Sequence, residues 1–525
     1  MNRKMGLFLF LAFIPLVLAF ALPQRVAHES AHKKLAGTYA AKTKQAVDHS
    51  KFAQLQVDFK TPQQVTAACI SCHNERHKEV MASSHWNWGR KEYIKGKGII
   101  SLGKDNVLNN FCIGASVNAQ SCAKCHIGYG NDRKDFDYKQ PLNVDCLACH
   151  DSTGTFVKGN SMGGMPDPSV NLRNVATHVG RPTRYNCGSC HFNGGGGNNV
   201  KHGDLEMAQM EPSKELDVHM GTDGSNMQCV DCHTADKHQI LGKVYSIASM
   251  NSGRVECQSC HGALPHKDSM INEHMEKVAC QSCHIPTYAK ESPTKLHWDW
   301  STAGKLKNGE PFVEEGPLGK DSYMSIKGSF TWGKNLEPDY VWFNGTSDHY
   351  LLGDKVADPS KPVVMNQLLG SYNDPDSKIT PVKIHTAKVP FDPVNKILIE
   401  PKTFSAKKGD GGYWKDFDWV KASELGMEHV GQPFSGKVDF IETEMYWPLN
   451  HMVSSKEKTV ACAECHTRND GRLAKVGGFY LPGRDRNGLV DGIGSILIAA
   501  SLLGIVLHGV LRGASHFLGK GGRNV

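Results

Sequence analysis

The chain lacks long hydrophobic runs between its two ends, and this absence limits the class of protein. Of its 525 residues 39% are hydrophobic and 22% are charged, and the extended apolar stretches are residues 6–22 and 489–511. A polytopic membrane protein is excluded, because it needs several such stretches. Counting Gly in place of Tyr gives an apolar share of about 46%, which is normal for a globular protein and excludes a disordered or collagen-like chain.

Signals for nucleic-acid and nucleotide binding are also missing. The formal net charge is +7, but the basic residues form no stripe along the sequence, so we expect no nucleic-acid partner. The glycine-rich run at residues 193–198 lacks the Gly-Lys-Ser/Thr ending of a phosphate-binding loop. We interpret this run as a flexible turn.

Cysteine, by contrast, is abundant and follows one pattern. The chain has 17 Cys, an odd number that a closed disulfide framework cannot use completely. Eight copies of Cys-x-x-Cys-His use all of them except Cys112: Cys69/Cys72/His73, Cys122/Cys125/His126, Cys146/Cys149/His150, Cys187/Cys190/His191, Cys229/Cys232/His233, Cys257/Cys260/His261, Cys280/Cys283/His284 and Cys462/Cys465/His466.

This pattern is the attachment signature of c-type haem. Two thiols three positions apart reach the two vinyl groups of one porphyrin, and the adjacent His is the proximal iron ligand. A single motif would also fit half of a zinc site or a redox dithiol, but eight copies that each end in His favour haem. The sequence therefore predicts eight covalent haem c groups, whose propionates would turn the net charge negative.

The two ends of the chain predict its location. Arg3 and Lys4 precede the apolar stretch 6–22, and Ala19 and Ala21 fit a small-residue cleavage site, so we interpret residues 1–21 as a signal peptide, with an uncleaved anchor as the alternative. Residues 489–511 are long enough to span a membrane, and basic residues follow them. The positive-inside rule then puts the tail in the cytoplasm and the haem-binding body on the periplasmic side of the inner membrane.

The C-terminal stretch also carries His508 and His516. An ionisable residue in a membrane span often has a function, and His508 could lie beside a haem b of a membrane subunit. The alternative is that both histidines lie at the membrane interface without a special role. The anchor itself makes a quinol-oxidising or cytochrome b partner plausible.

The spacing of the motifs predicts the domain organisation. Six motifs begin between residues 122 and 280, whereas residues 285–461 contain no motif but seven of the nine Trp. We expect a mainly α fold with extensive irregular loops wrapped around the haems, few short strands and one transmembrane helix; segments 329–332 and 340–343 are strand-like. The predicted parts are the signal peptide 1–21, a seven-haem domain 22–284, a Trp-rich subdomain 285–461, the eighth haem and linker 462–488, the transmembrane helix 489–511 and a cytoplasmic tail 512–525.

The second axial ligand of each iron decides what that iron can do. An iron with two imidazoles transfers electrons, whereas a weak or displaceable ligand leaves room for substrate. Three histidines near the mature N-terminus, His28, His32 and His49, are set aside. The distal candidates are the histidines close in sequence to motifs: His85, His178, His202, His219, His238, His266, His274 and His451.

Residues outside the motifs resemble a known family. They are Ser84-His85-Trp86, Asn109 to Cys112, Cys125 to Gly130, Val278 to Pro286 and Glu444 to His451. Together with the motif spacing over residues 60–470, they resemble the octahaem tetrathionate reductases, which are similar to octahaem hydroxylamine oxidoreductases and pentahaem nitrite reductases. The C-terminal span departs from the soluble members of that family, so electron delivery is expected to differ here.

The resemblance implies an active site at the second haem. In that family a lysine amine replaces the distal His, and a cysteine and an acidic residue lie nearby. Carried over to this chain, the lysine is expected to be Lys134, with Lys139 and Lys124 as alternatives. The cysteine is expected to be Cys112, and the acid Asp135 or Asp132. Each of these residues also has a simpler reading, as a loop residue or, for Cys112, as a small buried hydrophobe.

Two functions follow from these predictions. In the first, the protein is a periplasmic oxidoreductase that passes electrons to a small sulfur or nitrogen oxyanion, such as tetrathionate or nitrite, or to hydroxylamine. In the second, it is a non-catalytic conduit that hands electrons from the quinol pool to other cytochromes. An iron with lysine or water as its sixth ligand favours the first, and bis-His ligation throughout favours the second.

Overall fold

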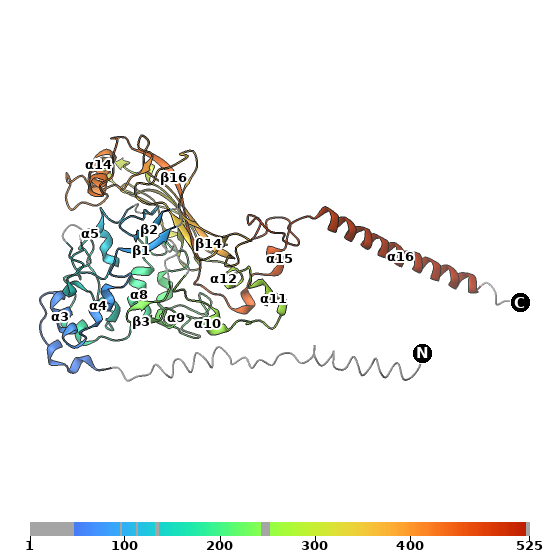
Figure 1. Ribbon diagram of the computed structural model, residues 1–525, viewed down its shortest axis with the longest axis horizontal. Helices are drawn as coiled ribbons and strands as arrows, with labels where there is room; N and C mark the ends of the chain where they lie inside the picture. Colours follow the sequence, from blue (N-terminus) through green and yellow to red (C-terminus); the bar gives the residue numbers. More distant parts are fainter. Residues whose placement is uncertain (1–46, 95–96, 112–113, 132–135, 243–251, 521–525) are drawn as a thin grey trace.

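The computed structural model describes residues 47–94, 97–111, 114–131, 136–242 and 252–520. Short helices and loops form one side of the body, a β-sheet forms the other, and a single helix extends away from both (Figure 1). We call residues 47–284 the motif region and residues 285–461 the sheet region. The predictions for Cys112, Asp132, Lys134 and Asp135, and for the signal peptide, lie outside the described residues.

The motif region consists of short helices joined by irregular segments. Its elements are η1 (His49–Lys51), η2 (Ala53–Leu55), α3 (Pro62–Cys72), α4 (Arg76–Met81), β1 (Gly89–Ile94), β2 (Gly98–Gly103), α5 (Ala119–Cys122), η3 (Ala123–Cys125), η4 (Pro141–Asn143), α6 (Leu147–His150), α7 (Leu172–Thr177), α8 (Arg184–His191), η5 (Met207–Met210), α9 (Cys229–Cys232), β3 (Ala235–Asp236), β4 (Gln239–Ile240), α10 (Gln258–His261), α11 (Ser269–His274) and α12 (Cys280–His284). Helix α3 starts with a capping box between Thr61 and Gln64 and has Pro62 in its first turn, both of which favour a helix start.

The sheet region is built around one ten-stranded sheet. Its elements are β5 (Thr294–Asp299), η7 (Trp300–Thr302), β6 (Leu306–Lys307), β7 (Glu310–Pro311), β8 (Val313–Glu315), η8 (Pro317–Gly319), β9 (Asp321–Met324), β10 (Gly328–Gly333), β11 (Asp339–Phe343), β12 (Ser347–His349), β13 (Val363–Leu368), β14 (Lys378–Asp392), β15 (Ile397–Leu398), α13 (Tyr413–Asp416), α14 (Trp419–His429), β16 (Asp439–Pro448) and η9 (Lys456–Lys458). The strand order is β12-β13-β16-β14-β5-β10-β9-β8, with β11 and β15 also pairing with β14.

Strand β14 organises this sheet. It is fifteen residues long and largely buried, and it pairs antiparallel with β16 over ten residue pairs and parallel with β5. The strand carries buried apolar residues such as Val382 and Val389 together with the fully buried polar residues Lys383 and His385. Against this sheet pack the stacked rings of Trp298 and Trp300, whose centroids lie 4.7 Å apart.

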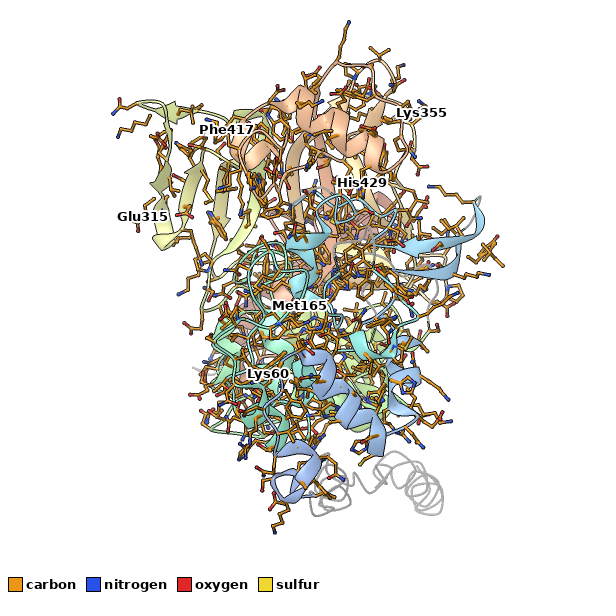
Figure 2. The ribbon with its side chains drawn as sticks, turned by 90° about the vertical axis from the view of Figure 1, so that its left-hand side faces the viewer. Lys60, Met165, Glu315, Lys355, Phe417 and His429 are labelled. Atoms are coloured by element: carbon orange, nitrogen blue, oxygen red, sulfur yellow. The ribbon has the colours of Figure 1, made fainter. Side chains whose placement is uncertain are left out.

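The predicted mainly α class is not confirmed, because about 29% of the chain is helical and 20% is strand. Both segments predicted as strands do form strands, β10 and β11. The sequence predicted few short strands, whereas the structure contains a ten-stranded sheet. Figure 2 shows it at one end of the body around the labelled Glu315, Phe417 and Lys355, with the helices around Lys60 at the other end.

The chain ends in α15 (Cys462–Cys465), an irregular segment and α16 (Gly488–Lys520). Residues Gly488–His516 of α16 are apolar and long enough to cross a membrane, and none of that stretch is buried against the rest of the protein. At 1.5 Å per residue, these 29 residues reach about 44 Å, more than the ~30 Å hydrocarbon core of a bilayer.

Candidate functional site

The Cys-x-x-Cys-His motifs lie on short helices or at their ends. In chain order they occupy the end of α3, α5 with η3, α6, α8, α9, α10, α12 and α15. One helical turn brings positions i and i+3 to the same side, so the two thiols of a motif point the same way. The next residue is the His, at the end of the turn. Each motif therefore presents two thiols and one imidazole to a common space.

Seven motif histidines face a second histidine ring. The ring centroids are 6.3 Å apart for His73 and His49, 6.4 Å for His150 and His238, 6.2 Å for His191 and His85, 6.2 Å for His233 and His451, 6.0 Å for His261 and His219, 6.1 Å for His284 and His266, and 6.1 Å for His466 and His274. With metal–nitrogen bonds of about 2 Å, two imidazoles on opposite sides of one metal have centroids about 6 Å apart. The residues present thus fit an iron between each pair.

Hydrogen bonds fix the orientation of these rings through Nδ1. That atom lies 2.8 Å from the Gly180 carbonyl in His150, 2.8 Å from the Leu241 carbonyl in His233, 2.9 Å from the Pro482 carbonyl in His466, 2.7 Å from the Met270 carbonyl in His274 and 2.8 Å from Glu79 Oε2 in His238. A metal-binding His usually donates its second N–H in this way. The arrangement leaves Nε2 to face the opposite ring.

Burial keeps several of these imidazoles neutral. It lowers the pKa of His85 and His150, and it lowers the pKa of His191 to about 3, with His85 adding a smaller effect. Neutral imidazole is the form that binds a metal. The environment of His85, His150 and His191 therefore favours iron ligation over protonation.

The second motif is different, because an amine approaches its histidine. Lys104 Nζ lies 2.5 Å from His126 Nε2, and the Trp88 ring packs 4.7 Å from the imidazole. Burial lowers the pKa of both Lys104 and His126, and the neighbouring Lys104 adds to the effect on His126. Among the described residues, the buried Nδ1 of His126 has no hydrogen-bond partner.

A second lysine completes this amine-lined site. Burial, followed by the charge of Lys104, lowers the pKa of Lys201 to about 7, and its Nζ lies 4.6 Å from the Trp447 ring. The buried Lys383 of β14 holds this segment, because its Nζ donates to the carbonyls of Val200 at 2.7 Å and Lys201 at 3.0 Å. The sheet region thus positions a lysine beside the second motif.

Buried charges also hold the backbone of the second motif. Lys158 Nζ donates to the His126 carbonyl and lies 3.0 Å from Asp145 Oδ2. Asp145 Oδ1 in turn accepts from the Tyr129 hydroxyl at 2.9 Å, and burial raises the pKa of Tyr129 well above its usual value. This network fixes Tyr129 and the His126 carbonyl beside the second motif.

The segment before Cys112 is anchored from β14. The ring of Phe111 stacks on His385 at 4.1 Å, and His385 Nδ1 lies 2.9 Å from Asn110 Oδ1. His385 is fully buried, and its Nε2 has no hydrogen-bond partner among the described residues. The two residues before Cys112 therefore have fixed positions, whereas Cys112 itself lies outside the described residues.

Six predicted distal histidines face motif histidines, and two do not. His85, His219, His238, His266, His274 and His451 form the pairs given above. His178 instead bonds through Nδ1 to the Asn174 carbonyl at 2.8 Å, and His202 packs edge-on against Trp447 at 5.0 Å. Among the described residues, His178 and His202 are therefore not members of the ring pairs, whereas His49, which closeness in sequence to a motif did not select, is one.

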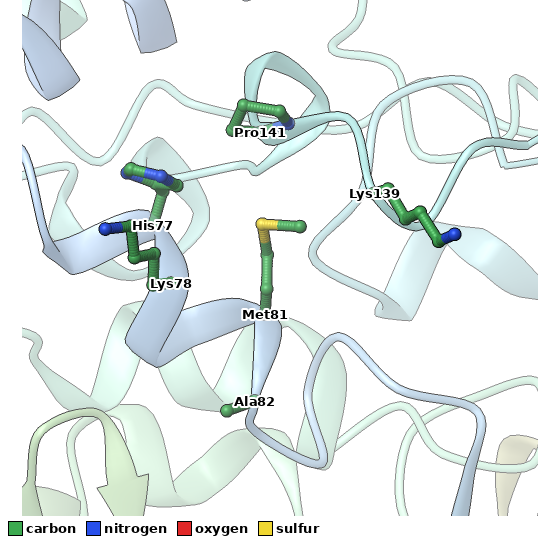
Figure 3. Close-up of a pocket in the computed structure, with 6 residues that line it drawn as sticks. All are labelled: His77, Lys78, Met81, Ala82, Lys139 and Pro141. Carbon is green, nitrogen blue, oxygen red and sulfur yellow. The ribbon is translucent and has the colours of Figure 1, made fainter.

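Where the structure describes them, the amines of the predicted lysines lie at groups other than His126, although Lys124 is itself part of the second motif. Lys124 Nζ donates to Asn160 Oδ1 at 2.6 Å, and Lys139 lines a pocket of about 470 Å³ with His77, Lys78 and Met81 of α4 (Figure 3). Lys104 was not among the predicted lysines, because the first choice, Lys134, was sought on the C-terminal side of the motif. Lys104 precedes the motif, at the end of β2, and only the fold brings it to His126.

Thiols of different motifs also lie close together. The thiols of Cys69 and Cys146, Cys125 and Cys190, Cys187 and Cys229, and Cys257 and Cys280 lie close enough to shift one another's pKa, and weaker electrostatic interactions link Cys149 to Cys190, Cys232 to Cys260 and Cys283 to Cys465. These links join motifs one, three, four, five, six, seven and eight in a row, with motif two attached to motif four. The eight attachment sites form one connected array.

Comparisons with known proteins agree with this geometry. Residues 295–469 match the family described as cytochrome c bacterial, and residues 172–262 match cytochrome c7 and related cytochrome c. The crystal structure of an octahaem cytochrome c from Shewanella oneidensis is similar to 81% of this chain and 94% of its own, with 42% identity and a TM-score of 0.75. An uncharacterised protein of Archaeoglobus fulgidus is 26% identical over 37% of this chain and 80% of its own length.

Proposed function

The chain belongs to the multihaem c-type cytochromes, and from this we propose that it binds eight haems and reduces a small sulfur or nitrogen oxyanion, or hydroxylamine, at the second one. The observation that carries the proposal is the difference between the motif histidines. Seven face a second imidazole, whereas His126 contacts the amine of Lys104. When bound, haem supplies one-electron transfer, and an iron with a displaceable ligand also binds small molecules.

The sixth ligand of the second iron is proposed to be a lysine amine, and two lysines compete for it. Lys104 touches His126, but two nitrogens on opposite sides of one metal are about 4 Å apart, more than the 2.5 Å seen here. Lys201 has an amine that is readily deprotonated, as its pKa of about 7 indicates. Whichever amine does not bind iron remains beside it, where it attracts an anion and supplies protons.

Matched variants separate the two lysines. We expect either Lys104→Leu or Lys201→Leu to convert one haem to a high-spin form, detected by electron paramagnetic resonance (EPR), and to leave seven haems unchanged. Lys124→Leu is the control, because its side chain is exposed and bonds to Asn160. If neither variant changes a haem signal, lysine ligation of the second iron is wrong.

The substrate is tested with the full-length holoprotein. Chemically reduced protein is mixed without oxygen with tetrathionate, nitrite or hydroxylamine, and reoxidation is followed by haem absorbance. We expect catalytic turnover with one of them and a loss on the order of 100-fold or more in the variant that removes the proton-donating amine. Slow reoxidation by all three contradicts the enzyme proposal.

The conduit remains the second candidate function, because the attachment sites form one continuous array. It predicts fast electron exchange with a small cytochrome and no turnover of the three substrates. Bis-His ligation of all eight irons would favour it over the reductase.

Membrane attachment and location are also part of the proposal. The apolar stretch Gly488–His516 supports an anchor, with the body in the periplasm and a quinol-oxidising or cytochrome b partner in the membrane. Extraction tests this directly. We expect the protein in the membrane fraction at high salt and its release only by detergent or by removal of residues 488–525.

A further inference from the structure

The segment between the eighth motif and α16 is folded onto that motif. We call residues 467–487 the connector. The Pro482 carbonyl accepts from His466 Nδ1 at 2.9 Å, and Gly483 follows with φ +88°. A Cβ on Gly483 would come within 2.6 Å of the His466 carbonyl oxygen, so these two segments of the backbone lie too close together for a residue other than glycine. The connector thus contacts the proximal His of the eighth site directly.

Arg484 holds the connector in this shape. Its guanidinium donates to the carbonyls of Leu473 at 2.8 Å, Val476 at 2.5 Å and Phe479 at 3.0 Å, and it pairs with Asp485 at 2.7 Å. Leu473, Val476 and Leu481 are buried in a cluster with Tyr340 and Ile379 of the sheet region. Saturated hydrogen bonding around one arginine and a small apolar core make the connector a fixed element.

The connector also reaches the seventh motif. Arg472 Nη1 donates to the Pro286 carbonyl at 2.8 Å, two residues after His284, and Arg472 pairs with Glu464 of α15 at 2.8 Å. The thiols of Cys283 and Cys465 lie close enough to interact electrostatically. The last two attachment sites and the connector are therefore one unit.

The distance from this unit to the membrane helix is short. Pro482 and Gly488 are six residues apart, which span at most about 21 Å even when fully extended. Helix α16 begins at once, with Asn487 Oδ1 accepting from the Val490 N–H at 3.1 Å. A helix longer than the hydrocarbon core starts in the headgroup layer. The eighth motif must then lie beside the membrane surface, whereas the amine-lined site is several motifs away along the array.

We propose that the eighth motif, held by the connector, is the port at which the protein takes electrons from a lipid-soluble hydroquinone. This inference rests on the proposed membrane anchor, and in it the eighth site itself meets the hydroquinone in place of the quinol-oxidising partner named above. The hydroquinone loses two electrons and two protons and becomes a quinone. The electrons pass to the protein at the eighth motif, and the protons go to the water beside the membrane.

The first experiment measures distance. In vesicles that contain lipids with gadolinium-chelating headgroups, we expect faster relaxation of one ferric EPR signal, and His274→Met identifies it by altering that same signal, because His274 faces His466. Faster relaxation of a different haem signal, or of all signals equally, overturns the placement of the port.

The second experiment breaks the coupling in the full-length holoprotein. Sixteen Gly/Ser residues are inserted between Asn487 and Gly488, which adds a flexible tether of about 20–24 Å. We expect reduction by a hydroquinone in vesicles to slow on the order of tenfold, because the tether no longer holds the port at the surface. The same sixteen residues appended after Val525 are the control and are expected to leave the rate unchanged.

A pair of point variants repeats the test without changing chain length. Arg484→Gln removes hydrogen bonds that shape the connector, whereas Lys475→Gln changes an exposed residue whose amine lies 3.3 Å from Asp339 Oδ1. We expect only the first to slow hydroquinone reduction and to shift the EPR signal of the His274/His466 site. Equal rates in all variants contradict the port.

The test of the port does not depend on which substrate the second site reduces. A soluble reductant such as dithionite bypasses the membrane, so its rate is expected to stay constant in the two Gly/Ser insertions and in the Arg484→Gln and Lys475→Gln variants. If dithionite-reduced protein fails to turn over tetrathionate, nitrite and hydroxylamine, the reductase proposal fails while the port stands. If turnover is normal but hydroquinone without a second membrane protein reduces nothing, the port proposal fails alone.

Discussion

The motif region and the sheet region are stabilised by different means. The sheet region has a large apolar core around Trp298, Trp300 and Phe391, and its long strands share backbone hydrogen bonds. Among the described residues, the apolar clusters that belong to the motif region alone are small, such as the one at Leu55, Val65 and Leu147 between short helices. Short helices are marginal without packing partners.

This difference indicates what the haems do for the fold. In the motif region, imidazole rings face each other across about 6 Å, so each ring pair needs a group between its members to be packed. In the sheet region, side chains pack on side chains. A chain can therefore fold one part by hydrophobic burial and the other by binding its cofactors.

The largest expected effect comes from preventing haem attachment. Full-length chain made without covalent haem is expected to lose backbone amide protection throughout residues 47–284 and to keep it in β14 and β16, because ligands that bind only the folded state supply its stability. Hydrogen exchange measured by mass spectrometry checks this region by region. Equal loss of protection in both regions would show that they fold as one unit.

A substitution in the apolar core is expected to destabilise the sheet region and to leave haem binding in the motif region intact. Trp298→Ala is expected to lower the free energy of unfolding of the sheet region by about 3–5 kcal/mol, because it removes a fully buried ring stacked on Trp300. Denaturant unfolding followed by hydrogen exchange in β14 measures the loss. Trp332→Ala, at a less buried ring, is the control with a smaller effect, and the low-spin haem signals are expected to persist in both.

Local patterns in the sequence predicted much of the motif region. Cys-x-x-Cys-His fixes one helical turn, so the place of each haem-binding turn can be read directly. Strands β10 and β11 were predictable from their aromatic and β-branched residues. These features depend on residues within a few positions of one another.

Long-range partners could not be predicted in this way. His451 faces His233 across 218 positions, and Lys201 depends on Lys383 of β14 for its position. The parallel pairing of β5 with β14 likewise joins segments far apart in the chain. No local pattern encodes such contacts, and for the same reason the extent of the sheet was underestimated.

The contact between the two regions provides a smaller test. Lys383→Met keeps the aliphatic stem but leaves the carbonyls of Val200 and Lys201 and the hydroxyl of Thr294 without their donor. We expect a loss of about 1–3 kcal/mol in the free energy of unfolding, since a buried acceptor is left unsatisfied. We also expect a shift in the EPR signal of the second haem alone. A stability loss without that shift would mean that Lys383 does not position Lys201.

The smallest expected effect concerns Glu206, a buried carboxylate at the same contact. Its oxygens accept from the backbone N–H groups of Glu291 at 3.1 Å and Ser292 at 2.6 Å, at the start of the sheet region. Burial raises the pKa of Glu206 above its usual 4.5 and outweighs the lowering effect of these hydrogen bonds. Ionisation is therefore less favourable in the folded protein than in the unfolded chain.

The sign of the pH dependence follows from this shift. Above pH 4.5 the unfolded chain releases the proton of Glu206 while the folded protein still holds it, so the free energy of unfolding falls as pH rises from 4.5 to the raised pKa. Glu206→Gln cannot titrate, and its own hydrogen-bond cost is the same at every pH. The difference in stability between wild type and variant is thus expected to shift against the wild type across this window. The measurement is denaturant unfolding of wild type and Glu206→Gln between about pH 4 and 7. If the free energies of unfolding of the two proteins change in parallel with pH, the ionisation of Glu206 does not destabilise the contact between the two regions.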